Sequence, residues 1–264
     1  MTGRTLRNVC LGMAVAGMTA LQVSAASAGA LIVSGDSSIA NPLTGLFVSI
    51  DAGNQTFFGN LLQGGASVVV HDTSAPFIDP LADQIHSFYS GLGGTASTLL
   101  GSAQSVTAAA LAGVNLYVAV APADAYDATE IAALAGLLDA GGSVFLLGEN
   151  GDSGVFAAMN ANINAAIAAL GGAMSIDGNL TDLGFIQATG SQIAVDPLMA
   201  GVATLTYGVP STVSGGTSLL TGLLGQTFIA YQDAASLSVA EPAAILLLAA
   251  GLAGLGIARR RPAG

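Results

Sequence analysis

The segments Val114-Asn115-Leu116-Tyr117-Val118-Ala119-Val120 and Ser143-Val144-Phe145-Leu146-Leu147 decide the fold class. Each is an almost unbroken apolar run of strand length, without the alternation of a strand that has one face in water. Between them, Asp127-Ala128-Thr129-Glu130 has the capping-box pattern, which predicts a helix that continues to Leu138 and stops at Gly141-Gly142. A buried strand, a helix and a second buried strand predict a parallel βαβ unit.

The same alternation extends along the chain on both sides of this unit. Further strands are expected at 30–33, 67–71 and 96–100, and further helices at 54–63, 80–92, 106–111 and 152–170. The sequence therefore predicts an α/β fold, a three-layer sandwich with about five parallel strands in its central sheet.

The stretch from 173 to 233 is rich in Gly, Thr and Ser and has strand-like pieces at 184–188, 203–207 and 227–231. We expect mixed, antiparallel strands there that complete the C-terminal edge of the sheet. No repeat or long linker divides the chain between 29 and 236, so one exported α/β domain is expected over that range.

Charge is scarce and unevenly distributed. Only 8% of the residues are charged, lysine is absent, and the formal net charge is −11. The five arginines stand near the two ends, whereas every acidic residue except Glu241 lies between 29 and 240. A domain without permanent cations cannot neutralise phosphates, so a nucleic-acid partner is excluded.

Residues 1–28 have the pattern of a secretory signal peptide. Arg4 and Arg7 precede an apolar run from Val9 to Leu21, and Ala26 and Ala28 supply the small residues that signal peptidase needs. The alternative is an uncleaved membrane helix, for which about 13 apolar residues are too few. The single cysteine lies inside this segment and leaves with it, so the mature domain has no disulfide and no thiol nucleophile.

Residues 237–264 combine three features at the end of the chain. Glu241-Pro242 is followed by an apolar run at 243–258, expected to be a transmembrane helix, and then by Arg259, Arg260 and Arg261. A plain C-terminal anchor would have the last two features alone.

This tail closely resembles the PEP-CTERM sorting signal of exported Gram-negative proteins, with Ala240 in place of the usual first proline. The resemblance covers about 25 residues and implies processing by an exosortase. It implies an inner-membrane precursor that becomes a cell-surface or extracellular matrix protein, associated with exopolysaccharide.

The middle of the chain loosely resembles class I glutamine amidotransferase-like, flavodoxin-like domains. The residues that carry the resemblance are 31–33, 139–148 and Asp196-Pro197-Leu198-Met199-Ala200-Gly201-Val202, with Asp196 in place of a histidine. The catalytic Cys and His of that family have no counterpart, so the resemblance favours the fold and argues against the activity.

Ligands of open parallel sheets bind beyond the carboxyl ends of the strands. The polar residues expected at that rim are Asp36, Ser37, His71, Asp72, Glu149, Asn150 and Asp152.

Two of these groups resemble SGNH (GDSL-type) hydrolase motifs. Gly35-Asp36-Ser37 resembles the block with the nucleophilic serine, and Gly148-Glu149-Asn150 resembles the block whose asparagine helps form the oxyanion hole. The family's C-terminal histidine is missing, so His71 would have to be the base. The alternative is that Asp36 and Ser37 form a polar turn or cap the following segment.

A calcium site is a candidate at Asp177, Asn179, Thr181 and Asp182, where oxygen-bearing side chains are closely spaced. Ala188 stands where an EF-hand loop has its bidentate glutamate, so a polar turn is the alternative. No other metal or cofactor is expected.

We therefore expect an exported, non-catalytic binding protein of the cell envelope or biofilm matrix. The alternative is a degenerate SGNH-like esterase or deacetylase that uses Ser37.

Overall fold

The computed structural model describes residues 29–40, 50–73, 79–151, 154–180, 182 and 184–237. They form a mixed α/β domain with a seven-stranded sheet of order β10-β11-β1-β5-β4-β2-β3. Five neighbouring strands are parallel, which confirms the mainly parallel sheet that the sequence predicts. These strands are β1 (Ala30–Ser34), β5 (Ser143–Leu147), β4 (Leu116–Val120), β2 (Ser67–His71) and β3 (Ala96–Leu100).

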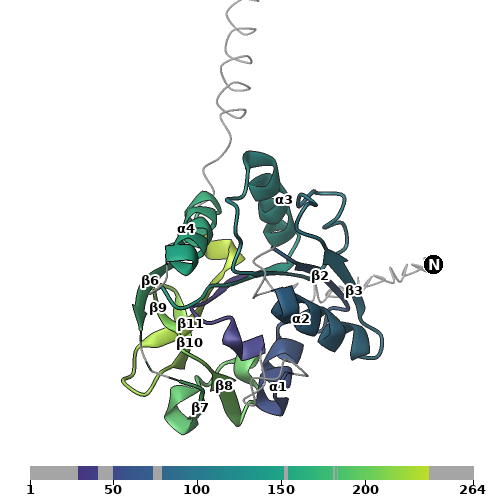
Figure 1. Ribbon diagram of the computed structural model, residues 1–264. Coiled ribbons are helices and arrows are strands. Elements are labelled where there is room, and N and C mark those ends of the chain that lie inside the picture. The colour runs from purple at the N-terminus through teal and green to yellow at the C-terminus, as the bar shows by residue number, and fades with distance from the viewer. Residues whose placement is uncertain are drawn as a thin grey trace, which may run out of the picture.

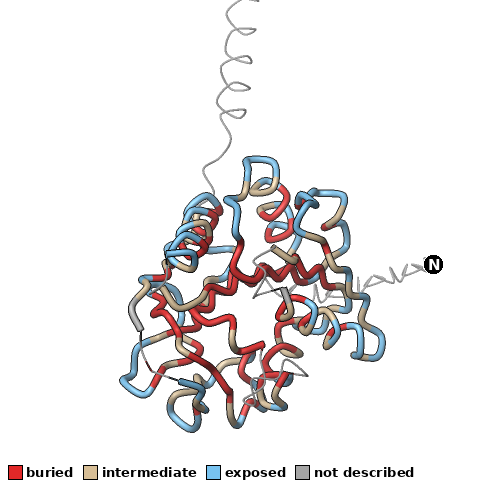
Figure 2. Tube along the Cα trace, viewed as in Figure 1, coloured by how far each residue is buried: buried red, intermediate tan, exposed pale blue. Residues whose placement is uncertain are grey.

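Helices cover both faces of this sheet (Figure 1). The helices α1 (Ala52–Asn60) and α2 (Asp79–Gly91) share one hydrophobic core with the sheet, whereas α3 (Ala128–Asp139) and α4 (Gly154–Ala169) share the other. Successive residues of one strand point to opposite faces, so in β5 Phe145 packs toward α1 while Val144 and Leu146 pack toward α3 and α4. The parallel strands β1, β5, β4 and β2 are buried along most of their length, whereas the edge strand β3 and the outer faces of the helices are more exposed, as Figure 2 shows.

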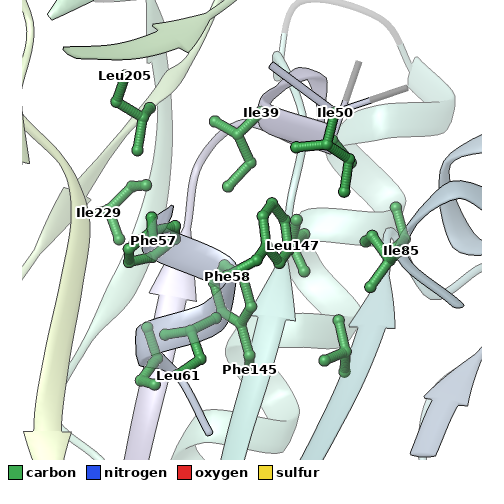
Figure 3. Packing of buried hydrophobic residues seen from close by; sticks show 14 of the residues in the cluster. Ile39, Ile50, Phe57, Phe58, Leu61, Ile85, Phe145, Leu147, Leu205 and Ile229 are labelled. Atoms are coloured by element: carbon green, nitrogen blue, oxygen red, sulfur yellow. The ribbon is translucent and has the colours of Figure 1, made fainter. Parts of the chain in front are cut away.

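Aromatic rings fill the core beneath α1 (Figure 3). The rings of Phe57 and Phe58 lie 5.9 Å and 6.1 Å from the ring of Phe145, centroid to centroid, and all three side chains are fully buried. Such edge-on and tilted ring pairs are favourable beyond the apolar area that they bury. Phe145 therefore joins the centre of the sheet to α1.

The capping box predicted for the third helix is present. The Asp127 side chain accepts hydrogen bonds from the N–H groups of Thr129 and Glu130, and the Glu130 side chain accepts one from the N–H of Asp127. The helix predicted at 106–111 is wrong, because that stretch forms turns. Val106 and Leu111 are buried in the core beside α3, and six residues are too few for a helix to form without strong packing along one face.

The C-terminal part completes the edge of the sheet only in part. β11 (Thr227–Asp233) pairs antiparallel with β1, as predicted for 227–231, and β10 (Thr217–Thr221), which was not predicted, pairs with β11. The expectation that 184–188 and 203–207 join this edge is wrong, because the strands there pair with each other. The remaining strands leave the sheet as two separate pairs: β6 (Ser175–Leu180) with β9 (Ser211–Ser214), and β7 (Ile186–Thr189) with β8 (Thr204–Tyr207). Gly215 and Gly216, with φ of +74° and +70°, let the chain turn between β9 and β10.

Four short 3₁₀ helices complete the described chain: η1 (Ser38–Ala40), η2 (Gly190–Gln192), η3 (Pro197–Met199) and η4 (Ala234–Ser236). The segment that carries the amidotransferase-like resemblance contains η3, which Asp196 caps by accepting a hydrogen bond from the N–H of Leu198.

The predicted signal peptide, its cleavage residues Ala26 and Ala28, and the sorting tail with Glu241, Pro242 and Arg259 to Arg261 lie outside the described residues. Among the residues that are described, no helix has both the length and the apolar character needed to cross a bilayer.

Replacing Phe145 by alanine tests the core beneath α1. We expect Phe145→Ala to lower the free energy of unfolding by about 3–5 kcal/mol, because a fully buried ring leaves a cavity between the sheet and α1. Urea unfolding followed by circular dichroism measures this change. Phe185→Ala is the matched control, because Phe185 is 44% exposed and its loss should cost less than about 1 kcal/mol. Equal losses in the two variants would contradict the assignment of Phe145 to the core.

Candidate functional site

At two places the connections that follow adjacent strands leave the sheet on opposite faces. β1 leads to α1 on one face, while its neighbour β5 leads to α4 on the other. β2 leads to α2, while its neighbour β4 leads to α3 on the opposite face. Diverging connections open a crevice beyond the carboxyl ends of the strands, where ligands of open α/β sheets bind. A ligand site is therefore expected beyond the carboxyl ends of β1 and β5 or beyond those of β2 and β4.

The end of β1 forms a tightly held turn at the first place. The Ser34 hydroxyl donates to the Asp36 carbonyl and accepts from the Asp36 N–H, and the Gly148 N–H donates to the Ser34 carbonyl over 2.7 Å. A Cβ at Gly35 would lie 2.0 Å from the Ser211 carbonyl oxygen. Glycine is therefore required where β1 passes β9, and the turn aims Asp36 and Ser37 into the protein.

Asp36 is fully buried and is held by backbone donors. Its two carboxyl oxygens accept hydrogen bonds from the N–H of Ser38 (2.8 Å) and the N–H of Gly208 (2.6 Å). Burial raises the pKa of Asp36, while these two hydrogen bonds act in the opposite direction. The bond to Ser38 matches the polar-turn alternative that the sequence left open for this residue.

Ser37 is fully buried next to Glu149, which follows β5. The Ser37 hydroxyl donates a hydrogen bond to Oε2 of Glu149. Burial, followed by the negative charge of Asp36, raises the pKa of Glu149 to about 7, although hydrogen bonds from Ser37 and Asn150 oppose the shift. Asp36 and Ser37, both fully buried, and the partly buried Glu149 thus lie together, and Glu149 changes its charge near neutral pH.

The backbone of Glu149 is held by two side chains that the sequence did not single out. Asn160 of α4 accepts from the Glu149 N–H and donates to the Glu149 carbonyl, and the Ser211 hydroxyl donates to the same carbonyl over 2.9 Å. The sequence gives one indication of this role: Asn160 is a polar residue in a mostly apolar helix. Asn150 follows directly and donates its N–H to Oε1 of Glu149.

His71 does not reach Ser37. Its strand β2 is separated from β1 by β4 and β5, which corresponds to about 14 Å at the usual strand spacing. The His71 ring instead bonds through Nδ1 to the Tyr117 hydroxyl at 2.8 Å. A Ser37–His71 pair, on which the SGNH-like alternative depended, is therefore not assembled, and the Ser37 hydroxyl bonds to Glu149 instead.

A cavity of about 210 Å³ opens at the second place, beyond β2, β3 and β4. Its lining includes His71, Thr73, Gln104, Asp124, Tyr126 and Glu130. His71 is 7% exposed, and its Nε2 atom has no hydrogen-bond partner among the described residues. Burial lowers the pKa of His71, while the negative charges of Glu130 and Asp72 and the backbone of Gln104 oppose the shift.

The two described carboxylates of the candidate calcium site have different hydrogen-bond partners. Asp177 lies in β6 and accepts from the hydroxyls of Ser175 and Ser214, whereas Asp182 is buried and accepts from the Tyr207 hydroxyl (2.5 Å) and the Leu223 N–H (2.8 Å). Thr181 lies outside the described residues, as does the side chain of Asn179. Among the described residues, no group of three or more His, Cys, Asp or Glu side chains is arranged to hold a metal ion.

Two further rim residues have separate positions. Asp72 follows β2 and is half-buried beside His71, with its N–H bonded to the Leu100 carbonyl. Asp152 lies outside the described residues.

No protein-family model matches the sequence, and no curated protein matches it. A solved structure described as the "mmIFT52 N-terminal domain" is similar over 47% of this chain, with 19% sequence identity and a TM-score of 0.36. The match spans 64% of that solved chain, less than two thirds of its length.

The partly buried carboxyl group of Glu149 predicts a pH dependence of stability. Its pKa is about 7 in the folded protein and near 4.5 when unfolded, so the folded state binds more protons between these values. The free energy of unfolding should therefore fall as pH rises from 5 to 8, by up to about 3 kcal/mol from this group. Urea unfolding across that range measures the fall.

Glu149→Gln is the matched variant, because it keeps the volume and an acceptor for Ser37 while removing the titration. We expect the variant to lose most of the fall and to be more stable than the wild type at pH 8. The lowered pKa of His71 makes the free energy of unfolding rise with pH, opposite to the effect of Glu149. Both proteins contain His71, so its contribution cancels when their curves are subtracted. Parallel curves for the two proteins would contradict the proposed protonation of Glu149.

Proposed function

We propose that this chain is an exported protein of the Gram-negative cell envelope, routed by a PEP-CTERM-type tail, whose α/β domain binds rather than catalyses. One observation carries the proposal: Glu241-Pro242, the apolar run 243–258 and the Arg259–Arg261 cluster stand in that order at the end of the chain. Signal peptidase and an exosortase are the processing partners that this order implies. The membrane is a partner of the precursor through 243–258.

The described domain is consistent with that route. Its first strand begins at Ala30, directly after the expected cleavage at Ala28, and its last element ends at Ser236, before the tail. The described residues contain no lysine or arginine, so their surface repels anionic polymers. Association with an anionic exopolysaccharide therefore requires a bridging divalent cation such as calcium.

Intact mass measured in separate fractions of the native host tests this proposal. We expect the form outside the inner membrane to have lost residues 1 to about 28 and the tail near Glu241-Pro242. A chelator wash should move this processed form from the cell surface into the medium. A single form that retains Arg259 to Arg261 and stays in the inner membrane would overturn the sorting proposal.

The bond between Ser37 and Glu149 favours one second candidate, an esterase or deacetylase. In that reaction the Ser37 oxygen attacks an acyl carbonyl while its proton passes to Oε2 of Glu149. The proton then goes to the departing oxygen or nitrogen, and water, deprotonated by Glu149, releases the acyl group from Ser37. Ser37 would have to become accessible to a substrate, because it is fully buried in the described structure.

Labelling by a fluorophosphonate probe separates the two functions. If Ser37 is a nucleophile, the probe labels the wild type and not Ser37→Ala, and Glu149→Gln slows labelling by about 10²-fold or more because the base is lost. Ser105→Ala, which changes an exposed serine at the other cavity, should label like the wild type. The binding proposal predicts no labelling of any of these proteins.

A further inference from the structure

The cavity beyond β2, β3 and β4 has walls that are fixed by hydrogen bonds. The two carboxyl oxygens of Glu130 accept from the N–H groups of Val106 and Asp127, both at 3.0 Å, and so tie the loop after β3 to the start of α3. The Asn162 side chain donates to the carbonyls of Pro122 and Ala123. Fixed walls reduce the entropy that a ligand must overcome on binding.

The backbone at this cavity is strained. Ala121, which directly follows β4, has φ of +42°, a left-handed conformation that side chains other than glycine rarely adopt. The residue is fully buried, and its N–H donates to the Leu147 carbonyl over 2.7 Å. Non-glycine residues held in this way concentrate at ligand sites and other functional positions.

One buried polar atom in the lining is left without a partner. His71 bonds through Nδ1 to the Tyr117 hydroxyl, which in turn lies 3.1 Å from the Tyr126 hydroxyl. Nε2 of the same ring has no partner with full hydrogen-bond geometry among the described residues, although the Gln104 backbone lies close enough to raise the pKa of the ring. A buried polar atom without a hydrogen bond is costly, so a ligand that supplies one gains binding free energy here.

The charges of the lining restrict the class of ligand. Anions are disfavoured, because Asp124 and Glu130 line the cavity, the described chain has no lysine or arginine, and Asp127 already occupies the N–H groups at the start of α3. Each oxygen of Glu130 already accepts a hydrogen bond from a backbone N–H group, which leaves this carboxylate fewer lone pairs for a cation. The remaining lining groups include hydroxyls, an amide and an imidazole, which suit a neutral ligand with several hydroxyl groups.

We propose that this cavity is a binding site for a neutral polyhydroxylated molecule no larger than a single sugar unit, with one ligand hydroxyl bonded to Nε2 of His71. The volume of about 210 Å³ is below that of sites for drug-sized ligands. The proposal stands on the cavity alone and does not depend on the sorting tail, on Ser37 or on Glu149.

The chain has two histidines, whose imidazole NMR signals allow binding at this cavity to be measured directly. His71 and His86 each bond through Nδ1 to a hydroxyl, of Tyr117 and Ser97 respectively, but of the two only His71 lines this cavity. The full-length ¹⁵N-labelled chain, in a detergent without a sugar headgroup, is titrated with glucose, galactose and N-acetylglucosamine. Long-range ¹H–¹⁵N spectra then report both imidazole rings.

We expect at least one of these sugars to shift the Nε2 signal of His71 saturably and to leave His86 unchanged. His71→Gln should weaken that binding about tenfold, while His86→Gln should leave it unaltered. An unchanged His71 signal with all three sugars, parallel shifts of both histidines, or a shift caused by methylammonium or inorganic phosphate but by no sugar would each overturn the proposal. Because the wild-type spectra decide the outcome, a variant that fails to fold does not affect it.

Discussion

The described fold keeps its buried carboxyl groups without a single lysine or arginine. Asp36, Glu149 and Asp182 all lie in the interior or at its edge, and their hydrogen-bond donors are backbone N–H groups and hydroxyls. Such donors stabilise a carboxylate less than a paired cation does, so burial dominates and raises the pKa values of Asp36 and Glu149. The turns after β1 and β5 follow from this constraint, because each must present its N–H groups and hydroxyls to a carboxyl group.

The same lack of cations restricts what the domain can bind. The cavity at the ends of β2, β3 and β4 offers hydroxyls, an amide, an imidazole and carboxylates. The outer surface of the domain is acidic. Both properties disfavour anionic ligands and leave neutral ligands or cation-bridged polymers as partners. The two places where strand connections diverge therefore differ in how far they are filled. Beyond β1 and β5 the residues Asp36 and Ser37 are fully buried, whereas beyond β2 and β4 a cavity remains.

Much of the sheet was predictable from the sequence, and the reason is its burial on both faces. Continuous apolar runs such as Ser67–His71 and Ser143–Leu147 match the observed strands to the residue, and glycines mark the ends of the helices. Between 173 and 214 the positions of β7 and β8 were predictable, but β6, β9 and the pairing of these four strands outside the main sheet were not, because short polar strands leave no periodic pattern. The rim position of Glu149 was predictable from the sequence. Its bond to Ser37 was not, because that bond depends on β5 lying beside β1, and the sequence does not reveal the order of the strands. The same order separates His71 from Ser37.

A hydroxyl and backbone donors hold the carboxyl group of Glu149 at the edge of the interior, where burial and the charge of Asp36 keep it protonated up to near-neutral pH. A ¹³C NMR titration of the side-chain carboxyl signals in the wild-type protein observes this directly. The account predicts that the Glu149 signal titrates with a midpoint near 7, and that Asp36 titrates above the ordinary range of an aspartate. If both signals titrate with midpoints below 5, as exposed carboxyl groups do, the account of this site is contradicted.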